Sequence, residues 1–299
     1  MHPRHILMAT LVAALWGGNF VAVKLATVHF SPVFLLALRF SLVALLMLPL
    51  APRIPRRHLG PVLAVSVALG SCHFGLMFSG LHRVEASTAA IATQLGVPFS
   101  TLLAVLLFRE QLGWRRIVGI VVAFCGVMVL AGAPEVAKDW LGLAMVVAAA
   151  FAWGVANVLI KRFGPFEPNM LNAWMALFAV PQLLLVSALT EQGQWASVLS
   201  AGWADWAALG YTVLGASVIA YSLWYALINS NPVSQVTPFT LLAPVFAVLA
   251  ACTILDEPLT LPLLLGGALT VAGVALCELR FRRLRAGRGR TPDVAAPPE

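Results

Sequence analysis

The sequence has few charged residues and few cysteines for a chain of 299 residues. Charged residues make up 10% of it, against about a quarter in soluble domains, and 61% is hydrophobic. This balance excludes an ordinary water-soluble enzyme and a disordered protein. The four cysteines, Cys72, Cys125, Cys252 and Cys277, lie in apolar runs without CxxC or zinc-type spacing. They are therefore interpreted as packing residues, and neither a disulfide nor a metal site is predicted.

Acidic residues are missing from the middle of every long apolar run. Glu110, Asp256, Glu257 and Glu278 all lie at the ends of runs. Because proton-coupled exporters of cationic drugs generally need a buried carboxylate, that mechanism is disfavoured. Facilitated diffusion, or coupling without a buried acid, is favoured instead. A Walker A motif, a nucleophile elbow and an HExxH motif are also absent, so no ATPase, no enzyme and no cofactor is predicted.

Ten apolar runs of nearly membrane-spanning length follow one another along the chain. A bilayer core about 30 Å thick needs about 20 apolar residues per helix. The runs are continuous, whereas the strands of a membrane barrel alternate. The first run contains Lys24 and is too long for a cleaved signal peptide, so we expect it to remain as a span. We predict an all-α membrane protein with helices at about 5–27, 32–51, 59–81, 87–108, 114–132, 140–162, 168–190, 204–228, 232–254 and 260–279.

Positive charge is distributed unevenly between alternate loops. With a cytoplasmic N-terminus, fifteen of the 19 Lys and Arg residues face the cytoplasm, and only Arg83 and Lys138 face the other side. The positive-inside rule therefore predicts a multi-pass protein of the bacterial inner membrane with both termini cytoplasmic. It also accounts for the net charge of +7 without a nucleic-acid partner. The basic tail, residues 280–299, is predicted to be disordered.

The two halves of the chain resemble each other. Residues 16–24 (WGGNFVAVK) match residues 153–161 (WGVANVLIK). Later in each half, Pro98, Glu110, Leu112, Gly119 and Gly126 match Pro244, Glu257, Leu259, Gly266 and Gly273. Each half has five runs, and an odd number inverts the second half in the membrane relative to the first. We predict two inverted five-helix repeats, 1–136 and 137–279, around a central cavity.

These features resemble the drug/metabolite transporter superfamily, EamA type. The resemblance covers about residues 5–279 and includes the EQL and EPL sequences at 110–112 and 257–259. Within the family, the chain is similar to bacterial exporters of aromatic and neutral amino acids. This implies a secondary transporter that exports such amino acids, or related amphipathic metabolites, by alternating access. An exporter of another metabolite or drug, and a non-transporting membrane scaffold or receptor, are the alternatives. The expected partners are a small-molecule substrate and the lipid bilayer, and the oligomeric state stays open.

Polar and aromatic residues deep in the apolar runs are the candidate substrate-binding residues. For each of them, packing or an interhelical hydrogen bond is the alternative. His73 is the only histidine at mid-run depth, and an aromatic pair four residues apart recurs in the second half at an offset of 147. The candidates are Trp16, Asn19, His73, Phe74, Phe78, Gln94, Trp153, Asn157, Tyr221, Tyr225, Gln235 and Phe239.

Glycines and prolines inside the runs are candidate hinges. Proline removes one helical hydrogen bond and kinks a helix, although static packing is the alternative role. The candidate gating residues are Gly17, Gly18, Pro98, Gly154, Pro238 and Pro244. Lys24 and Arg39 are the remaining charges within runs. One or both could pair with a carboxylate, and either could extend its charged group to the membrane surface or have a functional role; the sequence leaves their roles open.

Overall fold

The computed structural model describes residues 1–133 and 139–278, and all regular structure in these ranges is helical. Nine helical segments in the described ranges are long and apolar enough to cross a bilayer, and α2 (Pro32–Met47) is a shorter apolar helix. The predicted all-α membrane fold of ten helices is therefore confirmed. The predicted tail, 280–299, lies outside the described residues.

The spans begin and end within a few residues of the predicted positions. In chain order the helices are α1 (Pro3–Ala26), α2, α3 with α4 (Leu59–Val65 and Phe74–Arg83), α5 with α6 (Ala86–Ala92 and Gly96–Phe108), α7 (Trp114–Ala131), α9 (Trp140–Phe163), α10 (Pro168–Thr190), α12 with α13 (Trp203–Gly210 and Ala220–Ser230), α15 (Leu242–Ile254) and α16 (Leu261–Glu278). Two short helices, α11 (Gln194–Ser200) and α14 (Val233–Val236), precede α12 and α15.

Four spans change helix type, at matching places in the two halves. A π-helical segment, Ser66–His73, joins α3 to α4, and another, Tyr211–Ile219, joins α12 to α13. Tight 3₁₀ turns, Thr93–Leu95 and Thr237–Leu241, precede α6 and α15. Such π-helical segments are rare and often mark functional sites. The third and fourth spans of each half are therefore the places where a site is expected.

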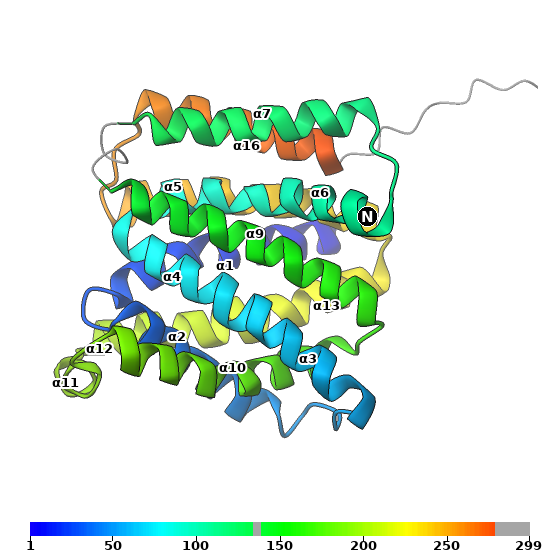
Figure 1. Ribbon diagram of the computed structural model, residues 1–299. Helices are drawn as coiled ribbons and strands as arrows, with labels where there is room; N and C mark the ends of the chain where they lie inside the picture. The colour runs from blue at the N-terminus through cyan, green and yellow to red at the C-terminus, as the bar shows by residue number, and fades with distance from the viewer. Residues whose placement is uncertain (134–138, 279–299) are drawn as a thin grey trace, which may run out of the picture.

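The helices of one half pack against those of the other. At one side of the bundle α7 packs on α16, and at the opposite side α2 packs on α10 (Figure 1). Between these pairs, α1 packs on α13 and α15, while α9 packs on α4 and α6. Since α1 and α9 are the first spans of their halves, these two sets of contacts are equivalent. The arrangement is that of two repeats related by a pseudo-two-fold axis.

Four glycines bring α7 and α16 into close contact. Gly119 lies against Gly273, and Gly126 lies against Gly266. A Cβ atom at Gly119 would lie only 2.6 Å from the carbonyl oxygen of Gly273, so the two backbones touch. In the sequence repeat Gly119 corresponds to Gly266, and Gly126 to Gly273. Gly119 thus contacts the counterpart of Gly126, and Gly126 contacts the counterpart of Gly119. A two-fold axis between the two helices produces this pattern.

Carboxylates cap the helices that begin at one end of the bundle. We call this the Lys24 end, because α1 reaches it near Lys24, and we call the opposite end, where α1 begins, the N-terminal end. Glu191 accepts hydrogen bonds from the first N–H groups of α2, at 2.8 and 3.0 Å, and Asp205 accepts one from Gly202 at 2.8 Å. These acids satisfy donors that a helix start leaves free, and they face the positive ends of helix dipoles.

A larger residue at position 119 is expected to separate α7 from α16. Gly119→Val places methyl groups where the backbone of Gly273 lies, and overpacking of this kind costs about 1–3 kcal/mol. Thermal unfolding of the purified protein in detergent should show a lower midpoint. Gly113→Val is the control, because a Cβ atom there meets nothing within 4 Å. Equal midpoints for the two variants would contradict the close contact.

Candidate functional site

A cavity of about 450 Å³ lies between the two halves, in the size range of small-molecule sites. The interrupted spans supply much of its wall. From the first half they contribute His73, Thr93 and Gln94, and from the second half Ala216 and residues 237–241 in part. The places where the helices change type are therefore the places that face the cavity, where non-helical backbone is tolerated in a membrane.

Seven of the twelve candidate binding residues line this cavity. They come from five spans of both halves, which the fold brings together around one space. They are Trp16, Asn19, His73, Phe74, Gln94, Trp153 and Tyr221. Their role in binding a substrate stays a prediction.

Two of the other candidates form interhelical hydrogen bonds away from the cavity. The amide of Asn157 donates to the hydroxyl of Ser100 at 3.1 Å. The hydroxyl of Tyr225 accepts from the amide of Asn172 at 2.8 Å. Neither Asn157 nor Tyr225 lines the cavity, which corrects the expectation of one shared aromatic and polar lining. Asn157 and Tyr225 each have a polar partner on a neighbouring helix, as the interhelical hydrogen-bond alternative proposed.

The last three candidates also lie outside the cavity wall. Phe78 is completely buried, and its ring lies 5.6 Å from the guanidinium of Arg39. Phe239 packs beside Trp16 against a small apolar cluster at the N-terminal end. Gln235 is exposed in the connection before α15. Position in an apolar run therefore did not reveal which face each side chain presents.

Aromatic rings form one wall of the cavity. The ring of Trp16 lies 5.5 Å from that of Tyr221 and 5.3 Å from that of Trp224, measured between centroids. Trp153 covers Gly96, where a Cβ atom would lie 2.6 Å from its indole. Trp224 also lines the cavity, and it was not among the candidates from the sequence.

The candidate hinge glycines lie where helices touch. Gly17 lies against the backbone of α15, and Gly154 lies against the backbone of α6. These are equivalent contacts in the two halves. Gly18 lies beneath the hydroxyl of Tyr211. A side chain at any of the three would push a neighbour away, so close approach is their structural role, and a hinge role stays a prediction.

The candidate prolines lie at the 3₁₀ turns. Pro98 and Pro244 occupy the third positions of α6 and α15, directly after the turns, and Pro238 lies within the second turn. Proline has no N–H, so Pro98 and Pro244 cannot donate to the carbonyls of Gln94 and Thr240, four residues earlier. Both Gln94 and Thr240 line the cavity. The paired prolines thus weaken the helix ladder beside the cavity.

His73 is held in the cavity wall by one hydrogen bond. Its Nδ1 lies 2.8 Å from the carbonyl oxygen of Ala149 in α9. A carbonyl oxygen can only accept, so Nδ1 carries the hydrogen in this contact. In the neutral ring Nε2 is then an acceptor, available to a donor on a bound molecule.

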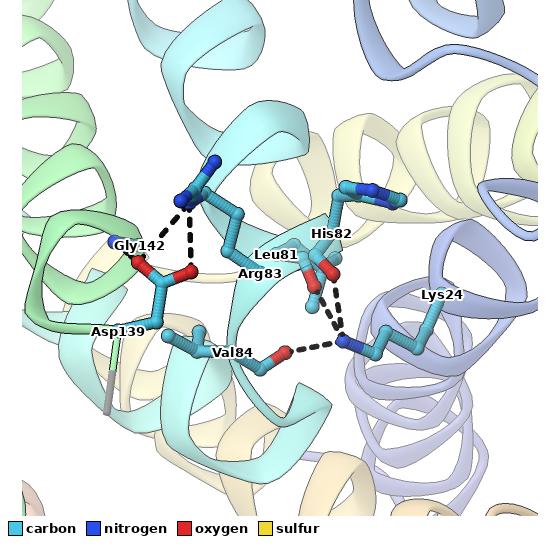
Figure 2. Close-up of polar contacts among 7 residues, drawn as sticks. All are labelled: Lys24, Leu81, His82, Arg83, Val84, Asp139 and Gly142. Carbon is cyan, nitrogen blue, oxygen red and sulfur yellow. Dashed lines mark hydrogen bonds and ion pairs between the residues drawn. The ribbon is translucent and has the colours of Figure 1, made fainter. Parts of the chain in front are cut away.

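The Lys24 end of the bundle is closed by polar links. The ammonium of Lys24 donates to the carbonyl oxygens of Leu81, His82 and Val84, at 3.0, 3.1 and 2.7 Å (Figure 2). These carbonyls lie where α4 ends and have no helical partner of their own. The link joins α1 to α4, and it gives Lys24 backbone acceptors at a helix end, a role that the sequence did not indicate.

Two further links join neighbouring helices at the same end. Arg83 at the end of α4 pairs with Asp139 at the start of α9, at 2.9 Å (Figure 2). The hydrogen bond from Arg83 holds the pKa of Asp139 below its usual value. Glu257, after α15, accepts from the N–H groups of Ala86 and Ser87 in α5, at 2.6 and 3.0 Å.

The counterparts of these residues make a different contact at the N-terminal end. Lys161 and Glu110 correspond in the repeat to Lys24 and Glu257, yet they pair with each other at an exposed position. This hydrogen bond lowers the pKa of Glu110. The cavity extends toward this end, where Glu278, the last residue of α16, lines it. The two ends of a symmetric fold are therefore in different states.

Glu278 corrects the expectation that no acid reaches the cavity. It lies at the end of a span, as the sequence shows, but its side chain forms part of the cavity wall. Its Oε2 atom is buried without a hydrogen-bond partner among residues 1–133 and 139–278. The missing mid-span acid therefore does not exclude a carboxylate from the transport route, because the cavity reaches the span end.

The family model for the EamA-like transporter family matches the chain twice, over residues 3–132 and 140–278. The chain belongs to the EamA-like transporter family. Like the fold, the two matches divide this EamA-like chain into two repeated halves. It is thus a multi-pass membrane protein of a transporter family.

Relatives of this EamA-like chain include named exporters. A protein of Salmonella typhimurium named "Probable amino-acid metabolite efflux pump" is 30% identical over 94% of this chain and 97% of its own length. The Escherichia coli protein of the same name is 28% identical, over 93% and 96%. A "Probable terminal-alkyne amino-acid exporter" of Streptantibioticus cattleyicolor is 30% identical, over 78% and 77%. A protein of known crystal structure shares the fold, with a TM-score of 0.65, 22% identity and coverage of 95% and 100%.

Water should reach the cavity but not the residues just beyond it toward the Lys24 end. In a variant without the four native cysteines, Gln94→Cys, in the wall, should react with a water-soluble thiol reagent in detergent. Ala90→Cys, one turn closer to the Lys24 end at a position 2% exposed, should react much more slowly.

The Lys24→Met change should then raise the reaction rate at Ala90→Cys, because it removes the link between α1 and α4. Lys24→Arg, which retains donors for the carbonyls, is the matched control. Fast labelling of Ala90→Cys in the unmodified background would show that this end is open.

Proposed function

We propose that this protein exports neutral or aromatic amino acids, or related amphipathic metabolites, across the bacterial inner membrane. The observation that carries the proposal is the cavity at the interface of two inverted repeats, with polar links between helices toward one end and Glu278 in its wall toward the other. Sites at such interfaces are typical of secondary transporters. The names of the relatives, amino-acid efflux pumps and an amino-acid exporter, support the substrate class.

The lining of the cavity suits an amphipathic molecule. Trp16, Trp153 and Tyr221 offer aromatic surface for an apolar side chain, whereas Asn19 and Gln94 offer amide groups for a polar one. A neutral amino acid carries both kinds of group. A substrate with strong negative charge, such as a sugar phosphate, would instead need several cations, and Arg39 is the only Lys or Arg in the cavity wall formed by the described residues.

Transport by alternating access would exchange the states of the two ends. Opening the Lys24 end requires Lys24 to leave the carbonyls of α4 and Glu257 to leave the start of α5. Closing the other end requires new contacts for Lys161 and Glu110, which now form an exposed pair. Because an exposed ion pair contributes little stability, this end is the easier one to rearrange.

We further propose that the N-terminal end faces the cytoplasm, since the basic loops gather there and the positive-inside rule favours that orientation. The cavity in this structure is then accessible from the cytoplasm, where an exporter collects its substrate. The Gln94→Cys variant tests this. A membrane-impermeant thiol reagent should label it in inside-out vesicles and not in intact spheroplasts, and the opposite result would reverse the orientation.

Purified protein in liposomes should catalyse counterflow of labelled amino acids. Vesicles loaded with unlabelled L-phenylalanine should accumulate external labelled L-phenylalanine above the level of empty liposomes. Loading with L-leucine should also drive uptake, because both are neutral, whereas L-glutamate should not. Absence of counterflow with every neutral amino acid would contradict the proposed substrate class.

An exporter of cationic drugs is the second candidate, because Glu278 places a carboxylate in the cavity wall. A lipophilic organic cation in the same counterflow assay discriminates the two. Counterflow of the cation but not of amino acids, abolished by Glu278→Gln, would favour this candidate.

Replacing Pro98 or Pro244 with alanine should slow transport more than it weakens binding. Alanine restores the hydrogen bond to the carbonyl of Gln94 or Thr240 and stiffens the span beside the cavity. A carrier that bends less easily cycles slowly, while its lining residues stay in place. Counterflow rates should fall several-fold, and the protection of thermal unfolding by substrate should persist. Pro181→Ala in α10 is the control, since it changes a proline inside a helix that does not line the cavity.

A further inference from the structure

Arg39 is a buried cation that forms no ion pair with a carboxylate among residues 1–133 and 139–278. It lies near the middle of α2, is 3% exposed, and lines the central cavity. None of the ion pairs formed among the described residues involves it. An ionisable residue at this depth normally has a partner or marks the route of a substrate. Its burial also excludes extension of the guanidinium to the membrane surface.

The contacts of Arg39 leave part of the guanidinium unused. Nε and Nη2 both donate to the hydroxyl of Ser217, at 3.3 and 3.0 Å, and the rings of Phe74 and Phe78 lie 5.3 and 5.6 Å from the guanidinium carbon. Nη1 is buried and has no hydrogen-bond partner among the described residues. A guanidinium carries five N–H donors, so a single hydroxyl cannot satisfy it. The hydroxyl and the rings supply partial negative charge only.

The fold does not require a charge at this place. Ser217 belongs to the π-helical segment of the second half, and Arg39 links it to α2. In the first half, the π-helical segment is linked to α10 by the neutral amide of Gln182. That amide bonds to Ser66 and Ser71 at 2.9 and 2.8 Å. A neutral side chain therefore suffices for the structural link, and the positive charge of Arg39 is left for another purpose.

We infer that Arg39 binds the carboxylate of the transported molecule, which makes the substrate class amino acids with a free carboxylate. This inference rests on the proposed export function. The planar guanidinium matches a carboxylate through two parallel hydrogen bonds. Phe74 and Tyr221, beside Arg39 in the wall, then contact the apolar part of the substrate. Since Nη1 has almost no exposed area, a neighbouring side chain has to move for a carboxylate to reach it.

Ligand pairs that differ only at the carboxylate test this assignment. The probes are L-phenylalanine and L-phenylalaninamide, each competing against labelled L-phenylalanine on the purified full-length protein in detergent. For the wild-type protein we expect the acid to compete at least tenfold better than the amide. For Arg39→Gln we expect this ratio to fall to about one. For Arg39→Lys, which keeps the charge but lacks the planar set of N–H donors, we expect an intermediate ratio. Because Arg39→Gln is expected to bind too weakly for a labelled tracer, its ratio is read from the thermal shift that each ligand produces.

Two controls separate recognition from folding. Ser217→Ala removes the structural link and keeps the charge, and Arg162→Gln removes an exposed cation at the end of α9, which lies outside the cavity wall. Both should retain the preference for the acid, even if their unfolding midpoints fall. Loss of the preference in Arg162→Gln would overturn the inference, because it would show a general effect of charge.

Four other results would also overturn the inference. A wild-type protein that binds acid and amide equally overturns the inference without any variant. A folded Arg39→Gln protein that keeps the tenfold ratio overturns it as well, while the export function stands. Equal protection by sodium acetate would show that the guanidinium accepts any small anion and would overturn the assignment to amino acids. If the wild-type protein binds no neutral amino acid, the proposed function fails and this inference fails with it.

Discussion

In a bilayer, every backbone N–H and C=O group must find its partner within the protein. This constraint decides where the spans of this chain are regular and where they are not. The π-helical and 3₁₀ segments, which leave backbone groups with altered partners, are placed where the third and fourth spans of each half face the cavity. At the Lys24 end, carboxylates and one ammonium satisfy the groups that helix ends leave free. The irregular segments around the cavity and the capped helix ends at the Lys24 end thus both meet the need for backbone hydrogen-bond partners.

The same constraint explains how similar sequences in the two halves produce different ends. Lys24 reaches three carbonyls at the end of α4, whereas its counterpart Lys161 pairs with Glu110. A lysine near the end of a span can satisfy a helix terminus or a carboxylate, and which one is in reach depends on how closely the neighbouring helices approach. Equivalent residues with interchangeable partners are what an alternating-access cycle needs, because each end can take the arrangement that the other has left.

The cavity combines aromatic surface with two charged groups at different depths. Arg39 lies at the middle of α2, and Glu278 lies at the end of α16 toward the N-terminal end. The ring of Trp16 contacts the rings of both Tyr221 and Trp224. A molecule with an apolar body and charged ends meets complementary groups along such a route. The inferred carboxylate site at Arg39 would hold a substrate at the depth where both halves contact it.

Hydropathy determined the ten spans, and matching residues in two halves of five spans each predicted the inverted repeat, with which the glycine pairs of α7 and α16 agree. The sequence did not determine which individual side chains point into the cavity. Phe74 lines the cavity and Phe78, one turn later, does not, and the same holds for Tyr221 and Tyr225. The sequence shows how deep a residue lies in an apolar run. The direction in which its side chain points depends on how the helix is rotated about its axis, and the packing of all the helices together sets that rotation. For the same reason only the tertiary structure showed that Arg39 lacks a carboxylate partner among the described residues, and that Glu278 at a span end reaches the cavity.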